Sequence, residues 1–246
     1  MWPLLAATFG IAWRIAVLAY PHPDFEESFA LRLAMAAMGL LFVGCGLWAW
    51  RRAPSNASWV FALYGAATGM HWGGPLGFGI ERADVPLLVL YFAISSLAAQ
   101  TLELHLAFAF PPSFRAIGQS AVRVALYVPT ALAVLGTLAL TVFGHSGTVG
   151  STVLGVVEPL LVLGTFTGLA GLAVWIARRF TTAPAERARW RLHWVLAAIA
   201  VALVPGAVYL AGVSVGPLEG WINLGFIPLP LALAAALTAG RAPASR

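Results

Sequence analysis

Eight long apolar runs, separated by short polar connections, constrain this chain more than any other feature of its sequence. Each run has about the 20 residues that an α-helix needs to cross the hydrocarbon core of a membrane. Only 9% of the 246 residues are charged, and no connection approaches the roughly 50 residues of a small soluble domain. We therefore expect an all-α, polytopic membrane helix bundle that forms one domain over residues 1–246, with spans near 2–20, 30–50, 58–80, 86–110, 121–143, 152–177, 191–213 and 221–240.

The distribution of arginine over the connections predicts the orientation of these spans. Cytoplasmic connections of membrane proteins carry an excess of basic residues. Arginine is concentrated after the second, fourth and sixth runs and in the tail, whereas the other connections are neutral or acidic. We therefore expect eight transmembrane helices with both termini in the cytoplasm, in a multi-pass protein of a bacterial inner (cytoplasmic) membrane.

Several classes of function are disfavoured by residues that the chain lacks. All 14 basic residues are arginine, and a retinal Schiff base requires a lysine. Cys45 is the single cysteine, so we expect neither a disulfide framework nor a cysteine metal cluster. The five histidines lack metal-ligand spacing, and no Walker loop, Gly-x-Ser-x-Gly or His-Glu-x-x-His motif occurs. We predict no metal, no catalytic residue and no nucleic-acid partner, and we interpret the net charge of +5 as a topology signal.

A polar stripe runs along the fourth apolar run. Ser96, Gln100 and Glu103 are spaced i, i+4, i+7 and would share one face of a helix, with His105 roughly opposite. A carboxylate at the membrane centre costs about 2.5 kcal/mol or more, so Glu103 should face protein or water. His193, at the inner start of the seventh run, is a candidate partner by depth. This group is either a structural cluster that ties helices together or a ligand-binding or proton-sensing site.

His71, in the middle of the third run, is a further candidate for binding a ligand or sensing a proton. A bis-histidine haem would need a second histidine at the same depth, and none is evident. Tryptophans and tyrosines near the ends of the runs are typical of an aromatic belt, although they would also suit a wall against a pigment or quinone. No cofactor is predicted, and contact with a haem or pigment stays open as an alternative.

Two charged residues lie at similar depth inside other apolar runs, Arg14 in the first and Glu158 in the sixth. An intramembrane ion pair between them is one interpretation. The alternatives are that Arg14 extends to the outer headgroups and that Glu158 is an interfacial residue preceding Pro159.

The connection between the sixth and seventh runs carries the densest charge of the chain. Its arginines either set the orientation alone or also dock an acidic protein partner or anionic lipid headgroups, since each basic residue near an anionic leaflet adds about 1 kcal/mol of attraction. These docking candidates are Arg178, Arg179, Arg187, Arg189 and Arg191.

Glycines recur at every fourth position of the third run and would form one face of a helix. Such a face allows close approach of a neighbouring helix. These residues are Gly65, Gly69, Gly73 and Gly77. The Gly73-Gly74-Pro75 sequence also predicts a kink or a break in this helix.

Two stretches resemble a known family. LELHLAFAFPPS (102–113) is similar to the His-x-x-x-x-Phe-Pro element in the membrane sensor regions of quorum-sensing-type bacterial histidine kinases. RARWRLHWVLAAIAVALVP (187–205) resembles the later basic-loop-then-helix element of those regions, and the positions carried over are His105, Phe110 and Pro111. The family continues into a dimerisation helix and an ATP-binding kinase domain, which this sequence does not contain, so the resemblance implies signalling through a separate partner.

We therefore expect a non-enzymatic, sensor-like membrane module that detects a lipophilic or membrane-delivered signal and acts through a protein partner. One alternative is an accessory subunit of a larger respiratory or photosynthetic membrane complex, packing against or shielding cofactors. A weaker alternative is a small-molecule transporter, which the lack of a clear inverted repeat disfavours.

Overall fold

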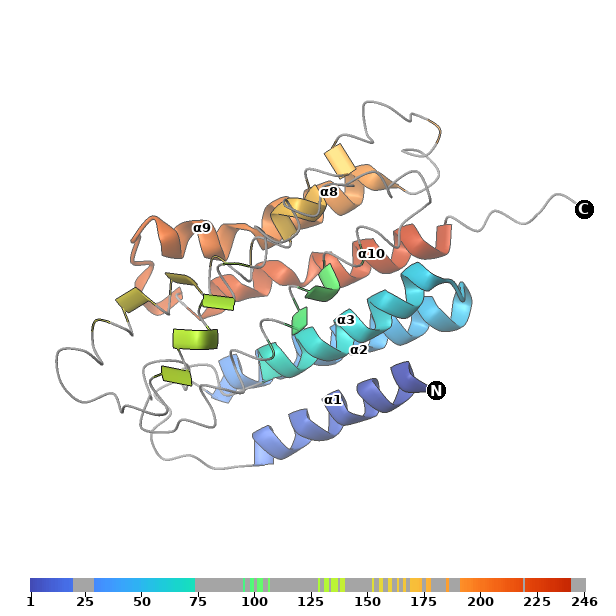
Figure 1. Cartoon of the computed structure of the whole chain (residues 1–246), viewed down its shortest axis with the longest axis horizontal. Helices are drawn as coiled ribbons and strands as arrows, with labels where there is room; N and C mark the ends of the chain where they lie inside the picture. Colours follow the sequence, from blue (N-terminus) through green and yellow to red (C-terminus); the bar gives the residue numbers. More distant parts are fainter. Residues whose placement is uncertain are drawn as a thin grey trace, which may run out of the picture.

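The structure is a computed structural model, and its description covers residues 1–19, 29–73, 95, 98–99, 101–103, 106, 128, 131–132, 134–136, 138–139, 152, 155–156, 159–160, 163, 166, 169–173, 176–177, 185, 191–218 and 220–239. The described residues form helices and no strand, which confirms the all-α prediction for this part of the chain. The continuous elements are α1 (Trp2–Ala19), α2 (Phe29–Arg52), α3 (Asn56–Gly73), α8 (Leu192–Ala202), α9 (Val204–Leu210), η3 (Gly216–Leu218), η4 (Trp221–Phe226) and α10 (Pro228–Ala239) (Figure 1).

Three helical stretches among the described residues are long and apolar enough to cross a membrane: Phe29–Arg52, Leu192–Leu210 and Trp221–Ala239. Large apolar side chains on their outer faces, such as Leu40 and Leu231, are exposed. A surface of this kind is stable when lipid covers it, and the chain is accordingly a membrane protein. The three stretches correspond to the runs expected near 30–50, 191–213 and 221–240.

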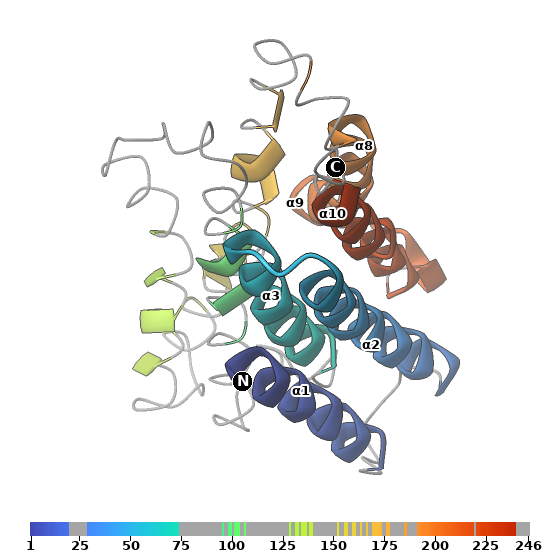
Figure 2. The ribbon, with the colours of Figure 1, turned by 90° about the vertical axis from the view of Figure 1, so that its right-hand side faces the viewer.

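The helices lie side by side with their axes close to parallel or antiparallel (Figure 2). α3 packs against both α1 and α2, and α10 packs against both α2 and α8. α2 and α10 therefore join the N-terminal helices to the last two spans. Their contact faces contribute Met38, Phe42 and Leu233 to a shared apolar core.

The turn between α2 and α3 is fixed by two serines. The backbone N–H of Ser58 donates to Ser55 Oγ at 3.1 Å, and the backbone N–H of Ser55 donates to Ser58 Oγ at 2.9 Å. This reciprocal pattern satisfies two N–H groups at the start of a helix that otherwise lack partners. Ser58 Oγ also donates to the carbonyl of Ala53, which ties the turn to the end of α2. The turn thereby sets the register in which α3 folds back along α2.

The last two spans are interrupted where prolines remove backbone donors. The seventh expected span divides at Leu203 into α8 and α9, and Pro205 occupies the first turn of α9. The eighth begins as the 3-10 helix η4 and continues as α10 from Pro228. Proline is tolerated in a first turn, where its missing N–H has no partner in any case. Neither break removes the element from the bundle, because η4 still packs against α8, α9 and α2.

Candidate functional site

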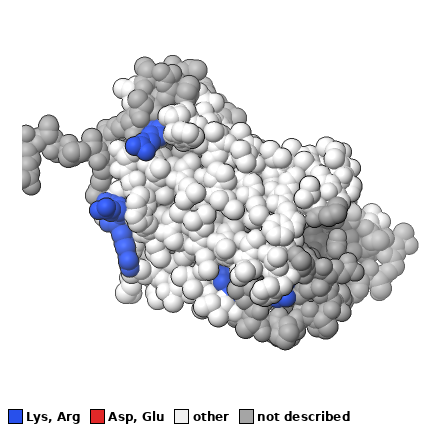
Figure 3. Space-filling view, turned by 180° about the vertical axis from the view of Figure 1, so that it is seen from behind, with Lys and Arg blue, Asp and Glu red and all other residues white. Residues whose placement is uncertain are grey.

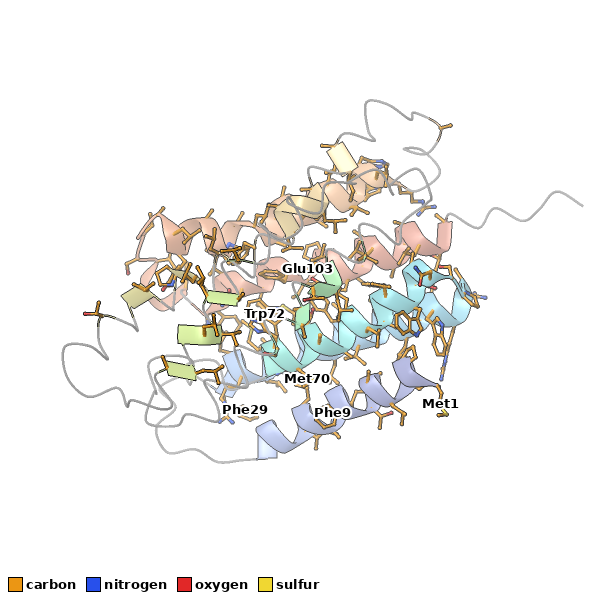
Figure 4. All side chains as sticks on the ribbon, viewed as in Figure 1. Met1, Phe9, Phe29, Met70, Trp72 and Glu103 are labelled. Carbon is orange, nitrogen blue, oxygen red and sulfur yellow. The ribbon has the colours of Figure 1, made fainter. Side chains whose placement is uncertain are left out.

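One face of α3 carries three polar side chains. Tyr64, Thr68 and His71 are spaced i, i+4, i+7, and all three are buried. This spacing places them on a single stripe of the helix. The stripe faces the segment 95–106, whose described residues are helical, and Glu103 lies in the middle of the bundle (Figure 4). We call this contact between α3 and the segment 95–106 the polar seam.

At one point of the polar seam, the Tyr64 hydroxyl donates to Glu103 Oε1 over 2.8 Å. The tyrosine is 1% exposed and the glutamate 3%, so no bulk solvent reaches this bond. The rings of Phe42 and Phe61 lie 5.8 and 6.4 Å from the Tyr64 ring and hold it in place. The second carboxyl oxygen, Glu103 Oε2, is buried without a hydrogen-bond partner among the described residues.

Further along, His71 Nδ1 lies 3.4 Å from Ser95 Oγ, and the tautomer of the ring decides which atom donates. Along α3 this contact follows Tyr64 by seven residues, whereas along the other segment it precedes Glu103 by eight. Those separations correspond to about 10 and 12 Å of helix. The two contacts therefore match a pair of antiparallel helices in a single register.

Thr68 lies between these two contacts on the same face of α3. Its Oγ1 is buried close to the Tyr64 hydroxyl, but it makes no hydrogen bond of standard geometry in the described part of the chain. Buried polar atoms are usually satisfied by protein or by ordered water, so two unsatisfied oxygens on one helical contact are uncommon. The polar seam can therefore accept a proton, a water molecule or a polar group of a ligand.

Arg14 enters the bundle from α1 on another side of α3. Its side chain is 3% exposed, and its Nε donates to the carbonyl oxygen of Gly69 over 3.0 Å. The guanidinium passes directly over Gly39 of α2, where an added Cβ would lie 2.6 Å from Nε. Arg14 therefore does not extend to the headgroups, which was one of the alternatives. Its guanidinium lies in a slot between α2 and α3 that glycines leave open. The expected ion pair with Glu158 cannot be judged, since Glu158 lies outside the described residues.

Close glycine contacts join α2 to α3. A Cβ on Gly69 would lie 2.8 Å from Val43 Cγ2, and one on Gly65 would collide with the carbonyl oxygen of Phe42. Both glycines thus face a neighbouring helix rather than lipid. Gly73 ends the described part of α3, while its contacts and Gly77 fall outside the description.

His193 lies where the sequence predicts, at the start of the seventh run, but it is not a described partner of Glu103. It is exposed at the start of α8, and its ring lies 5.4 Å from that of Trp194. The expected pairing of Glu103 with His193 is therefore corrected, because Oε1 pairs with Tyr64 on α3. Arg191 is exposed just before α8. The remaining candidates fall outside the described residues: Gln100, His105, Arg178, Arg179, Arg187 and Arg189.

Sequence reasoning missed Tyr64, Thr68 and Ser95. The i, i+4, i+7 spacing of Tyr64, Thr68 and His71 is a signal of the same kind as the stripe proposed for the fourth run, and it could have identified the partner helix. In the fourth run, the buried positions include Ser95 and Glu103, spaced i, i+8. The polar contact is thus shared between two helices, whereas the sequence interpretation assigned it to one.

The chemistry of the site is that of hydrogen bonds and proton exchange, supplied by a carboxyl, a phenol, an imidazole and hydroxyl groups. Within the described residues, no group of three or more histidine, cysteine or acidic side chains is placed to hold a metal ion. Comparisons with protein-family models, with curated proteins and with solved structures find no match. The function must therefore be argued from this geometry.

Proposed function

We propose that the chain is a sensor-like module of a bacterial inner membrane, which responds to a signal within the bilayer and acts through a separate protein partner without catalysing a reaction. The observation that carries this proposal is the polar seam. It combines two side-chain hydrogen bonds between helices with two buried oxygens, Glu103 Oε2 and Thr68 Oγ1, that lack partners among the described residues. The resemblance to sensor regions of histidine kinases supports the same conclusion.

An incompletely satisfied contact between helices suits a switch better than a purely structural role. A fully satisfied polar cluster would only rigidify the bundle, because each buried unsatisfied group costs free energy. A proton or a polar ligand group at Glu103 Oε2 would change which hydrogen bonds the two helices make. The signal thereby biases the position of α3 relative to the segment 95–106.

An aromatic path connects the polar seam to the last span. Trp72 follows His71 directly, and their rings lie 5.0 Å apart in an edge arrangement. The Trp72 ring lies 4.8 Å from that of Phe226 in η4, which in turn lies 5.7 Å from the ring of Phe166. A shift of α3 would therefore move the rings that contact η4, where the chain changes from a 3-10 helix to an α-helix.

The arrangement of the helix ends supports an orientation with both termini in the cytoplasm. The start of α1, the end of α2, the start of α8 and the end of α10 lie at the same end of the bundle (Figure 1). Arg51 and Arg52 end α2, and Arg191 precedes α8, so this end carries three of the five described arginines. Of the other two, Arg14 is buried and Arg32 lies in the first turn of α2. The positive-inside rule assigns such an end to the cytoplasm. We propose eight spans on this basis and on the apolar runs.

The sensor proposal is tested by asking whether the Glu103 carboxyl changes its protonation with pH while the fold stays intact. In the polar seam, the described titratable side chains beside Glu103 are Tyr64 and His71, and the charged side chain of Arg14 on α1 contacts the same helix α3 at the carbonyl of Gly69. The protein is reconstituted in lipid nanodiscs, and infrared difference spectra are recorded between acidic and alkaline pH. Wild type should show a carboxyl carbonyl-stretch band that Glu103→Gln abolishes and that Tyr64→Phe shifts.

A second measurement tests output through a partner. Tagged wild type, Glu103→Gln and a control, Thr238→Val, are purified gently from native membranes, and the retained proteins are quantified. Thr238 bonds only to carbonyls of its own helix in the described contacts, so its variant should behave like wild type. A sensor predicts a retained signalling protein whose amount or activity changes in Glu103→Gln alone. A retained oxidoreductase or pigment complex, unaffected by Glu103→Gln, would instead identify an accessory subunit.

A further inference from the structure

A groove on the outer surface, between α8 and α10, is independent of the polar seam. Its volume is about 430 Å³, and its walls are largely apolar. Trp194, Ala197 and Val201 line it from α8, and Leu231 and Ala235 line it from α10. Trp194, Val201 and Leu231 are 62%, 45% and 49% exposed, so the groove opens toward the surface that lipid covers.

One end of the groove is charged. Arg191 is the charged residue among those that line it, and it is exposed immediately before the first turn of α8. Basic side chains lie at one end and along one edge of the surface that Figure 3 shows, and no acidic side chain of the described residues is visible on that face. An exposed guanidinium beside an apolar groove complements a phosphate that is joined to a hydrocarbon chain.

We propose that this groove binds one anionic phospholipid of the surrounding membrane, with its phosphate at Arg191 and one acyl chain lying between α8 and α10. The proposal rests on the groove and on the membrane location alone, and it holds whatever signal the polar seam detects.

The length of the groove suits one acyl chain of a lipid. From Arg191 to Val201 the groove follows ten residues of helix, which is about 15 Å. This length equals half of the roughly 30 Å hydrocarbon core, which is the depth that one leaflet's acyl chains fill.

The side chains at the charged end suit a headgroup. Trp194 follows Arg191 by three residues, so both lie on one side of α8. Tryptophan is favoured at the level of lipid headgroups, because its ring is apolar and its indole N–H can donate a hydrogen bond. Both donors would then contact the headgroup, while the alanines leave room for the chain below it.

The experiment uses phosphatidylglycerol and phosphatidylcholine that each carry the same photoactivatable diazirine in one acyl chain. Each probe is mixed into nanodiscs that hold the protein and is activated by light, and the labelled residues are mapped by mass spectrometry. In wild type, we expect labelling within 192–203 and 228–239 to be about fivefold stronger for the anionic probe. This factor corresponds to the roughly 1 kcal/mol that one basic residue contributes near an anionic surface.

Two pairs of variants locate the effect. Arg191→Gln should bring the two probes to equal labelling in the groove, whereas Arg52→Gln, an exposed arginine at the end of α2, should leave the ratio unchanged. Ala197→Leu should reduce labelling by both probes, because the larger side chain fills the groove. Ala200→Leu is the control, since Ala200 is exposed on the same helix but does not line the groove.

Three results would overturn the proposal. The first is equal labelling by both probes in wild type, and the second is an unchanged ratio in Arg191→Gln. The third is efficient disulfide-linked dimer formation by Ala197→Cys in a Cys45→Ala background, which would make the groove an interface between two copies. If Ala197→Leu fails to fold, the comparison of Arg191→Gln with Arg52→Gln decides alone.

Discussion

At the residue scale, Tyr64 supplies the described hydrogen bond to the Glu103 carboxyl. Replacing it by phenylalanine keeps the ring between Phe42 and Phe61 but leaves a buried acceptor without its donor. Such a loss costs about 1–3 kcal/mol. We expect Tyr64→Phe to lower the unfolding free energy by that amount, measured by denaturant titration in mixed micelles. Glu103→Gln keeps an acceptor for the hydroxyl, so its cost should stay below about 1 kcal/mol, close to the average for hydrogen bonds between membrane helices. Equal stability of Tyr64→Phe and wild type would contradict this reading.

Arg14 offers a second prediction at this scale, because its slot can be tested from both sides. In wild type, Gly39→Ala places a methyl group 2.6 Å from Arg14 Nε, so the variant should lose about 1–3 kcal/mol of stability through overpacking. Arg14→Ala alone leaves a cavity and deprives the Gly69 carbonyl of this donor, which should cost about 2–4 kcal/mol. In the double variant the methyl group enters vacated space. The double variant should therefore lose less stability than the sum of the two single losses, by at least about 1 kcal/mol. Strict additivity, measured by the same denaturant titration, would show that the guanidinium lies elsewhere.

The sequence identified some of these residues and missed others for a physical reason. A carboxyl or guanidinium group inside an apolar run is costly to bury, so Glu103 and Arg14 stand out without any structure. Burying a tyrosine or a threonine in a membrane helix costs much less free energy than burying a charged group. Tyr64 and Thr68 therefore did not stand out in the sequence. Ser95 becomes significant only once the register against His71 is known. Which polar side chains contact each other depends on the register between the two helices, and no local pattern in a single sequence encodes that register.

At the element scale, the contact between α2 and α3 depends on glycine where the backbones approach most closely. Gly65→Ala would drive a methyl group into the backbone carbonyl of Phe42, which cannot move aside as a side chain can. We expect a loss of more than about 2 kcal/mol and a reduced yield of folded protein. Gly44→Ala is the matched control on α2, since nothing lies within 4 Å of its added Cβ. That substitution should be neutral or stabilising by up to about 1 kcal/mol, because alanine favours a helix over glycine. Both variants are compared by thermal unfolding in the same detergent, and similar behaviour would place Gly65 on a lipid-facing side.

The helices themselves were largely predictable, while their interruptions were only partly so. The runs expected near 2–20 and 30–50 correspond to α1 and α2, because an apolar run of about 20 residues has few alternatives in a membrane. The break after Ala202 and the 3-10 geometry of η4 did not follow from hydropathy. Pro205 and Pro228 mark where a helix can restart, but proline alone does not decide between a kink and a new helical segment. Contacts with neighbouring helices make that decision, and η4 contacts α8, α9 and α2.

At the scale of the whole molecule, the same end of the bundle collects the start of α1, the turn between α2 and α3 and the start of α8 (Figure 1). The opposite end holds the start of α2 and the end of α9. This separation agrees with the alternation of arginine along the sequence, which was obtained without reference to any contact. The positions of the helices along the sequence were the most predictable property of the described residues, since hydropathy acts along the chain and needs no register. The polar seam was the least predictable, since it requires two helices to meet.

The last prediction tests this topology position by position. In a Cys45→Ala background, single cysteines replace one residue in each of the second to seventh connections, and intact cells are treated with a membrane-impermeant maleimide. If the chain crosses the membrane eight times with its N-terminus in the cytoplasm, odd-numbered connections face outward and even-numbered ones inward. The outward set that should be labelled in intact cells is Ala83, Ser146 and Val213. The inward set that should react only after lysis is Asn56, Ser113 and Ala185.

Asn56 and Val213 form the decisive pair within this series. Asn56 begins α3 and Val213 follows α9, and both are exposed, at opposite ends of the described bundle (Figure 1). Both cysteines should therefore react in detergent at similar rates, which controls for burial. Labelling of Asn56→Cys in intact cells, together with protection of Val213→Cys, would reverse the orientation. Two successive connections that react alike would remove a span from the count, and the arginine alternation would then need another explanation.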